Sequence, residues 1–198
     1  MRMSNQPRQI VLGVSGASGV VYAQRLLEVL AESDCQTHVI LTAPAKQVMG
    51  EELGIKDFST QGLIGRSADR VTFHGNQDLF CKLASGSQAA DAMVICPCSA
   101  HSLAAIAAGL ADSLLLRCAY VCLKERRPLV LTTREAPLTQ IDLQNMLTIS
   151  QAGGIICPAS PGFYTHPQSM DDLVDFVVGK LLDLLQIGHD LPTRWRGQ

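Results

Sequence analysis

A run of glycines and serines lies between positions 13 and 19, in the order Gly13-Val14-Ser15-Gly16-Ala17-Ser18-Gly19. It follows a short apolar stretch and precedes an amphipathic one, so it is predicted to join a strand to a helix. Glycines let the backbone approach an anion closely, and the first N–H groups of a helix point at such a ligand with the positive end of the dipole. This run therefore predicts a binding site for a phosphate-bearing cofactor.

Three known motifs fit this run poorly. Its glycines do not follow the G-x-G-x-x-G order of dinucleotide sites, and no lysine follows them as in a P-loop. Ser15 lies in a near-match to the G-x-S-x-G nucleophile turn, but no acid and histidine follow in the required order. An alternative explanation, that the glycines serve only to form a tight turn, stays open. Phosphate binding without lysine suits FMN, through its phosphate or its ribityl chain.

A second polar turn, Pro97-Cys98-Ser99-Ala100-His101-Ser102, also follows an apolar strand and opens a helix. The carboxyl ends of parallel strands face the ligand crevice in such sheets, so Ser99 and Ser102 are candidates for flavin contacts. Ser99 is equally well explained as a helix N-cap. His101 is interpreted as a polar residue at the helix start.

Basic residues gather in the second half of the chain. Arg117 and Lys124 are seven positions apart, so they share one face of a predicted helix. Arg134 and Glu135 end the next strand, at the ligand-facing edge, although a surface salt bridge there stays open. Further on, glycine and proline surround an aromatic pair in residues 161–169, which predicts a shaped loop over a pocket.

The elements that must position these residues alternate along the chain. Strands are expected at 9–14, 37–41, 71–73, 92–96, 128–132 and 155–157, and helices at 20–30, near 49–53, and at 102–109, 114–124, 141–152 and 171–185. Residues 54–90 are otherwise expected to be irregular. This order predicts an α/β fold, a doubly wound, mostly parallel sheet of the Rossmann or flavodoxin-like kind with helices on both faces. No linker or repeat divides the chain, so residues 1–198 are expected to form a single domain, with a tail from about 186 that packs on the site or on a neighbour.

Composition narrows the class of protein. The net charge is −2, so no overall field favours nucleic acid or an anionic membrane. The N-terminus is polar and resembles no signal peptide, and we expect a cytoplasmic protein. The seven cysteines are expected to be reduced and mostly structural, and their spacing predicts no metal site. The apolar stretch 103–123 is expected to contribute to an oligomer interface.

Five strings of this chain resemble the UbiX-type flavin prenyltransferases, flavodoxin-like flavoproteins related to the cysteine decarboxylase flavoproteins. They are GVSGASG, THVILT, VICPCSAHSL, LKERRPLVLTTREAPL and PGFYTHPQSMDDLVDFVV, in order along nearly the whole chain. The resemblance implies an enzyme that joins a dimethylallyl group from dimethylallyl monophosphate to reduced FMN, at N5 and C6. It also implies that the product, prenylated FMN, is passed to a UbiD-type decarboxylase, and that the enzyme is a dodecamer with sites at subunit junctions.

The resemblance also implies roles for individual residues. FMN contacts are expected from Gly16, Ala17, Ser18, Thr42, Ser99, Ser102 and Arg134. The prenyl phosphate is expected to bind Tyr164, Lys180, Arg117 and Lys124, and Trp195 is expected to line the prenyl pocket. Glu52 is expected to reach a neighbouring subunit's site, Glu135 to handle protons, and Ser18 to lie beside the reacting ring. The catalytic set is thus Ser18, Glu52, Arg117, Lys124 and Glu135, with no metal.

The charges of this catalytic set suit the chemistry of prenyl transfer. Loss of an allylic phosphate leaves a developing negative charge, which fixed cations stabilise without a metal ion. Two alternatives stay open. A flavoprotein cysteine decarboxylase would use a histidine such as His74, but it would need a PASANT-like turn and a P-x-M-N-x-x-M-W clamp that this chain lacks. Non-catalytic FMN storage or delivery would keep the flavin loops without needing Arg117, Lys124, Glu135 and Tyr164 together.

Overall fold

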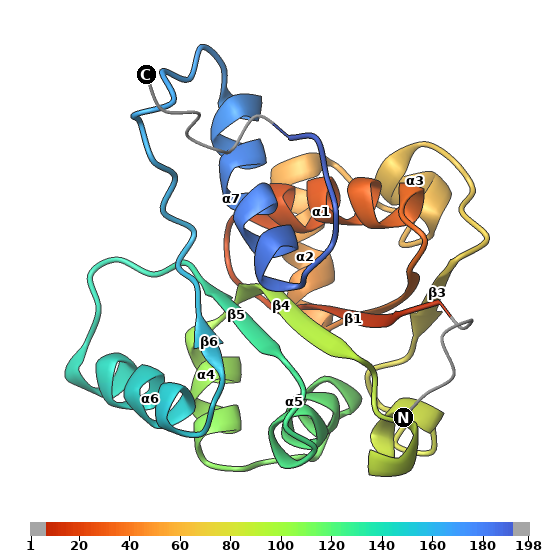
Figure 1. The fold of residues 1–198 in the computed structure, drawn as a ribbon, viewed down its shortest axis with the longest axis vertical. Helices are drawn as coiled ribbons and strands as arrows, with labels where there is room; N and C mark the ends of the chain where they lie inside the picture. Colours follow the sequence, from red (N-terminus) through yellow and green to blue (C-terminus); the bar gives the residue numbers. More distant parts are fainter. Residues whose placement is uncertain (1–6, 192–198) are drawn as a thin grey trace.

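Parallel strands form one sheet in the order β3-β2-β1-β4-β5-β6, and every neighbouring pair is parallel. The computed structural model describes residues 7–191 (Figure 1). The order reverses between β1 and β4, which confirms the predicted doubly wound α/β fold. The strands are β1 (Gln9–Val14), β2 (Gln36–Leu41), β3 (Val71–His74), β4 (Ala92–Cys98), β5 (Leu129–Thr133) and β6 (Ile155–Ile156).

Helices cover both faces of the sheet. One apolar core lies between the sheet and α1, α2, α3 and α7, and a second core lies between the sheet and α4, α5 and α6. The helices are α1 (Val20–Glu32), α2 (Ala43–Leu53), α3 (Thr60–Ile64), α4 (Ala100–Ala107), α5 (Leu114–Lys124), α6 (Gln140–Gln151) and α7 (Met170–Leu184).

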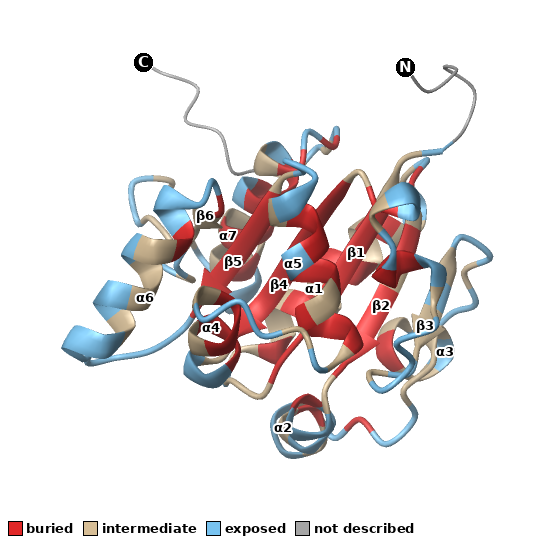
Figure 2. Ribbon diagram, turned by 90° about the horizontal axis from the view of Figure 1, so that it is seen from below, coloured by how far each residue is buried: buried red, intermediate tan, exposed pale blue. Residues whose placement is uncertain are grey.

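Successive side chains along a strand point to opposite faces of the sheet and so fill the two cores in turn. In β4, Val94 faces the core under α1, whereas Met93 and Ile95 face the core under α5. The strands at the centre of the sheet are buried along nearly their whole length, as Figure 2 shows. Strands covered on both faces need apolar residues at successive positions, which explains the continuous aliphatic runs in the sequence.

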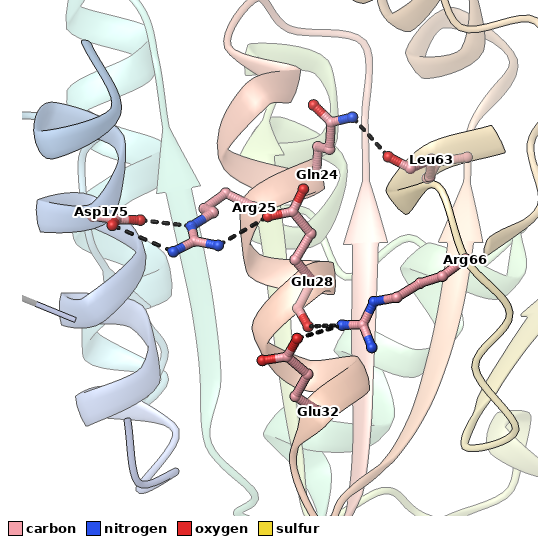
Figure 3. Close-up of polar contacts among 7 residues, drawn as sticks. All are labelled: Gln24, Arg25, Glu28, Glu32, Leu63, Arg66 and Asp175. Atoms are coloured by element: carbon pink, nitrogen blue, oxygen red, sulfur yellow. Dashed lines mark hydrogen bonds and ion pairs between the residues drawn. The ribbon is translucent and has the colours of Figure 1, made fainter. Parts of the chain in front are cut away.

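Polar contacts hold α1 against its neighbours on two sides (Figure 3). On one side, Arg25 Nε donates to Asp175 Oδ1 of α7 at 2.6 Å. On the other, Gln24 Nε2 donates to the backbone oxygen of Leu63 in α3 at 2.6 Å. These ties fix the position of the helix that begins directly after the 13–19 turn.

The predicted irregularity of residues 54–90 is partly wrong. This stretch contains α3 and two short 3-10 helices, η1 (Lys82–Ala84) and η2 (Gly86–Gln88). The helix α3 has only five residues, too few to show a hydrophobic period. Its local signals were present in the sequence, however, because Ser59 caps its N-terminus and Gly65 ends it with a positive φ.

The apolar residues expected at an interface are mostly buried within the chain. Leu103 and residues 114–116 pack in the core under α5, so this expectation is wrong for them. Exposed aliphatic side chains gather instead on α6 and just before it, where Leu138, Ile141, Leu143 and Leu147 are each 41–72% exposed.

The start of the expected C-terminal tail packs on its own chain. Ile187 is buried in the core under α1, and Arg8 Nη1 donates to the backbone oxygens of Leu185 and Gln186 at 2.9 Å. The rest of the tail, from residue 192, lies outside the described residues. Within residues 7–191, no helix has the length and apolar character needed to cross a membrane.

Candidate active site

A cavity of about 610 Å³ opens at the carboxyl ends of the strands, across the point where the strand order reverses. Ligands of doubly wound sheets bind at this position. The predicted residues that line it come from four separate segments of the chain and are Gly16, Ala17, Ser18, Thr42, Ser99, Ser102, Arg134 and Glu135. All seven residues expected to contact FMN are therefore brought together, with Glu135 beside them.

A buried hydroxyl joins the two loops that flank the reversal point. Ser15 Oγ accepts a hydrogen bond from the Ser99 N–H at 2.8 Å and donates to the Pro97 oxygen at 3.1 Å. The Ser15 N–H also donates to the Pro97 oxygen, at 3.2 Å. Ser15 therefore fixes the 13–19 turn to the turn after β4. The sequence analysis included Ser15 in the 13–19 turn but assigned it no role of its own.

Three helices begin at the cavity wall. The N-caps of α2, α4 and α5 are Thr42, Ser99 and Ser113, and each hydroxyl accepts from the backbone N–H of the third residue of its helix. All three residues line the cavity. The positive ends of three helix dipoles therefore converge on one space, which favours an anionic group there.

Asn76 is a cavity residue that sequence reasoning missed. It follows β3, and its backbone and side-chain oxygens accept from the N–H groups of Leu114 and Leu115, at 2.7 and 3.0 Å. It thereby fixes the start of α5 beside the cavity. Its position after a short, half-buried edge strand was the one available signal, and that strand was surrounded by sequence expected to be irregular.

Two glycines of the turn have separate structural reasons. A Cβ on Gly16 would collide with the ring of Pro44 at the start of α2, so glycine lets the two segments touch. Gly19 has a φ of +96° at the start of α1, a conformation that favours glycine. The tight-turn explanation therefore applies to Gly19, whereas Gly16 is needed for the close contact with Pro44, and both are compatible with the turn also lining the cavity.

The donors of the cavity suit FMN. Hydroxyl groups of Ser18, Thr42, Ser99 and Ser102 can bind a ribityl chain or a phosphate, and the guanidinium of Arg134 adds a positive charge. A volume of about 610 Å³ lies within the range of ligand pockets. Within residues 7–191, no group of three or more His, Cys, Asp and Glu side chains is placed to hold a metal ion.

Arg117 and Lys124 lie away from this cavity. They line a second groove of about 630 Å³ with residues 79–82 and 84–88. Arg117 Nε donates to the backbone oxygen of Ala84 at 2.9 Å, which holds the guanidinium over that segment. Lys124 Nζ lies 3.1 Å from the carboxylate of Glu125. The predicted common face of the two cations is confirmed, but neither of them lines the flavin cavity of the same chain.

Tyr164 and Lys180 also lie outside the residues that line this cavity. The rings of Tyr164 and Phe176 meet edge to face, with centroids 5.6 Å apart. Phe176 and Lys180 are one helical turn apart on α7, so Tyr164 lies near the helix face that carries Lys180. The backbone of Ala159 pairs with Thr133, which places the following loop beside the end of β5 and hence near Arg134.

Glu52 binds the start of α1 in its own chain. Its carboxylate accepts from the N–H groups of Gly19 and Val20, at 3.0 and 3.2 Å. It thus neutralises the helix terminus next to the predicted flavin turn. The expected contact of Glu52 with a neighbouring subunit stays a prediction. Trp195 lies outside the described residues.

A doubly wound sheet with a hydroxyl-lined cavity at its reversal point defines a nucleotide- or flavin-binding α/β protein, and the Flavoprotein family model matches residues 1–182. A flavin prenyltransferase UbiX of Pseudomonas aeruginosa is 44% identical over 200 residues, covering 97% of this chain and 96% of that protein. The chain belongs to the UbiX-type flavin prenyltransferases of the Flavoprotein family, as its motifs predicted.

Solved structures of relatives agree with the fold. AnUbiX in complex with FMN and dimethylallyl pyrophosphate has a TM-score of 0.88 at 38% identity, covering 97% of this chain and 99% of that one. A dodecameric FMN-dependent UbiX-like decarboxylase from Escherichia coli O157:H7 has a TM-score of 0.87 at 38% identity, covering 96% of this chain and 100% of that one.

Proposed function

We propose that this protein transfers a dimethylallyl group from dimethylallyl monophosphate to N5 and C6 of reduced FMN, in the cytoplasm. The product is prenylated FMN, which serves a UbiD-type decarboxylase. The observation that carries this proposal is the cavity at the reversal point, where Ser18, Arg134 and Glu135 converge with the N-termini of three helices. Membership of the flavin prenyltransferase family supports the type of reaction.

The cavity residues divide into flavin-holding and proton-handling groups. Backbone at Gly16 and Ala17, the hydroxyls of the cavity and Arg134 hold FMN as the acceptor substrate. Ser18 is exposed at the cavity, which supports our proposal that it lies beside the reacting ring. The Glu135 carboxyl, next to Arg134 at the end of β5, accepts and returns protons as the new bonds form.

The donor phosphate needs cations in addition to Arg134, which is assigned to FMN. When the C–O bond of the dimethylallyl ester breaks, its electron pair leaves with the phosphate, and fixed positive charge stabilises this leaving group. Arg117 and Lys124 lie in a separate groove, while Tyr164 contacts Phe176 of α7, the helix that carries Lys180. We infer that the complete site forms between copies, in a dodecamer, with Arg117 and Lys124 given to a neighbour's cavity.

The remaining predicted residues fit the same assembly. Glu52 is exposed on α2, next to the flavin turn, where an approaching subunit can meet it. Trp195 is proposed to line the prenyl pocket. An aromatic and apolar wall keeps water from an allylic cation, which would otherwise be captured as an alcohol.

Anaerobic incubation tests the reaction. The purified protein is mixed with reduced FMN and dimethylallyl monophosphate, and the released flavin is analysed by mass spectrometry. We expect a flavin that is heavier by one C5 unit, and none when the ester is omitted. A flavin of unchanged mass, bound with a normal affinity, would leave FMN storage as the function. Parallel incubation with the pyrophosphate ester shows which donor is accepted.

A further inference from the structure

Four helices begin at the flavin cavity or directly beside it, and they differ in how well they can bind a phosphate. At the start of α1, the Glu52 carboxylate already accepts two backbone N–H groups. Asp112 directly precedes Ser113, the N-cap of α5, and also lines the cavity, so a carboxylate lies at that helix start as well. The second residue of α2 is Pro44, which has no N–H to donate. Each of these three helix starts is therefore partly neutralised or partly deprived of donors.

The start of α4 has neither a carboxylate nor a proline. Its first turn contains no acidic residue, and residues 99–102 all line the cavity. The Ser99 hydroxyl accepts a hydrogen bond from the Ser102 N–H at 3.2 Å. The N–H groups of Ala100 and His101, the first two residues of the helix, have no acceptor within the helix itself. These donors and the helix dipole favour the phosphate of FMN at the start of α4.

The charged side chains of the cavity wall oppose this phosphate more than they attract it. They are one cation, Arg134, and two carboxylates, Asp112 and Glu135. The phosphate group itself adds up to two negative charges near neutral pH. The groove of a neighbouring copy does not offset this excess, because its cations are assigned to the phosphate of the prenyl donor. Among the described residues that line the cavity, His101 is the one further side chain that can become positive.

His101 lies where such a charge is needed. It is the second residue of α4, its side chain is exposed, and it lines the cavity beside the two free N–H groups. A histidine ordinarily changes its charge between pH 5 and pH 8, so a proton is available to the ring near neutral pH. An imidazolium and a phosphate form a charge-assisted hydrogen bond, which is stronger than a neutral one.

The helices packed against α4 place no other charge on His101. The charged side chain of α6 is Asp142, which caps its own helix through Thr139. The charged side chains of α5 are Arg117 and Lys124, and both line the second groove. The three charged groups of the cavity wall are therefore the ones that face the imidazole.

We propose that His101 binds the phosphate of FMN as an imidazolium, so that binding of FMN is coupled to the uptake of a proton. The affinity for FMN gains from this contact as the pH falls from 8 to 6, because more of the protein then carries the proton. Riboflavin has the same ring system and ribityl chain but no phosphate, so its affinity gains nothing from the proton. The inference rests on the flavin-binding part of the proposed function and does not depend on prenyl transfer.

Flavin titrations of the full-length, flavin-free protein test this contact. Dissociation constants for FMN and for riboflavin are measured at pH 8 and at pH 6, in the native protein and in His101→Gln. The ratio of the FMN dissociation constants, variant over native, should increase about five-fold from pH 8 to pH 6. The proton of the phosphate and the carboxylates of the cavity affect both proteins, so their effects cancel in this ratio. For riboflavin the ratio should stay constant.

Two further variants separate the charge of His101 from its shape. His101→Lys is positive at both pH values, so it should bind FMN more tightly than the native protein at pH 8. Its affinity relative to His101→Gln should not change between pH 8 and pH 6. His166→Asn is the matched control, because His166 is also exposed but does not line the cavity. This control should behave as the native protein does.

The possible results separate this inference from the proposed function. A ratio that is equal at the two pH values, or that changes equally with riboflavin, would overturn the role of His101 and leave flavin binding intact. A native protein that binds no FMN at either pH would overturn the flavin-binding part of the proposed function, and this inference with it.

Discussion

Ser15 carries three hydrogen bonds between the two loops at the reversal point, two through its hydroxyl, and is only 1% exposed. In Ser15→Ala the part-buried Ser99 N–H loses its acceptor, and the buried Pro97 oxygen loses a donor. We expect a loss of about 1–3 kcal/mol in the free energy of unfolding, the usual penalty for an unsatisfied buried group. Urea denaturation measures it, and titration should show weaker FMN binding.

Ser18→Ala is the matched control for stability. Ser18 lies three residues further along the same turn but is exposed. An exposed serine in a loop should change the free energy of unfolding by less than about 0.5 kcal/mol when it is replaced. Equal effects of the two substitutions would mean that Ser15 does not hold the two loops together.

At the level of elements, hydrogen bonds from His38 to Gln9 and His74 join the three neighbouring strands β1, β2 and β3, and they should make the association of these strands sensitive to acid. The pKa of His38 is about 4 in the folded protein and about 6.5 in an unfolded chain. The unfolded chain therefore binds more protons between these values, so stability should fall as the pH drops from about 6.5 toward 4. After allowing for partial exposure, we expect a loss of about 1 kcal/mol between pH 7 and pH 5.

Urea titrations at pH 7 and pH 5 measure this dependence. His38→Gln, which cannot titrate, should lose less stability than the native protein over the same interval. Carboxylates contribute equally to both proteins, so they cancel in the difference. An identical pH dependence in the two proteins would contradict the assigned pKa of His38.

The elements also explain how far the sequence could predict this site. The turns after β1 and β4 were predictable, because glycines, serines and the preceding aliphatic runs are local signals. Asn76 was not, because its role depends on the start of α5, which lies 38 residues away along the chain. For Arg117 and Lys124, helical spacing predicted their shared face, but spacing along a helix does not say which cavity that face meets.

For the whole molecule, the separation of the Arg117–Lys124 groove from the flavin cavity predicts complementation between subunits. Lys124→Ala should keep FMN bound and lose turnover, because Lys124 lies outside the flavin cavity of its own chain. Arg134→Ala should also lose turnover, because Arg134 lines the flavin cavity of its own chain. Co-expressed one to one, the two variants should recover about a quarter of native activity, because random mixing pairs an intact cavity with an intact neighbouring groove at that frequency.

Assays of the co-purified mixed assembly check this prediction, with each single variant assayed alone as a reference. If both residues served one cavity of one chain, no mixture would regain activity. The exposed aliphatic side chains of α6 offer a surface for such an assembly, since Ile141 is 72% and Leu143 53% exposed. Figure 2 shows the outer side of α6 largely exposed.

The convergence of α2, α4 and α5 on one cavity has a consequence for mutational surveys of this enzyme. Much of the positive potential there belongs to main-chain N–H groups, which every amino acid except proline carries. Alanine scanning would therefore underestimate the contribution of these three helix N-termini to anion binding, because replacing a side chain leaves the main-chain dipoles in place. Gly16 and Gly19 are the exceptions, since even a methyl group at Gly16 meets Pro44 and one at Gly19 strains the backbone. The most conservative substitutions at these two positions should be among the most damaging.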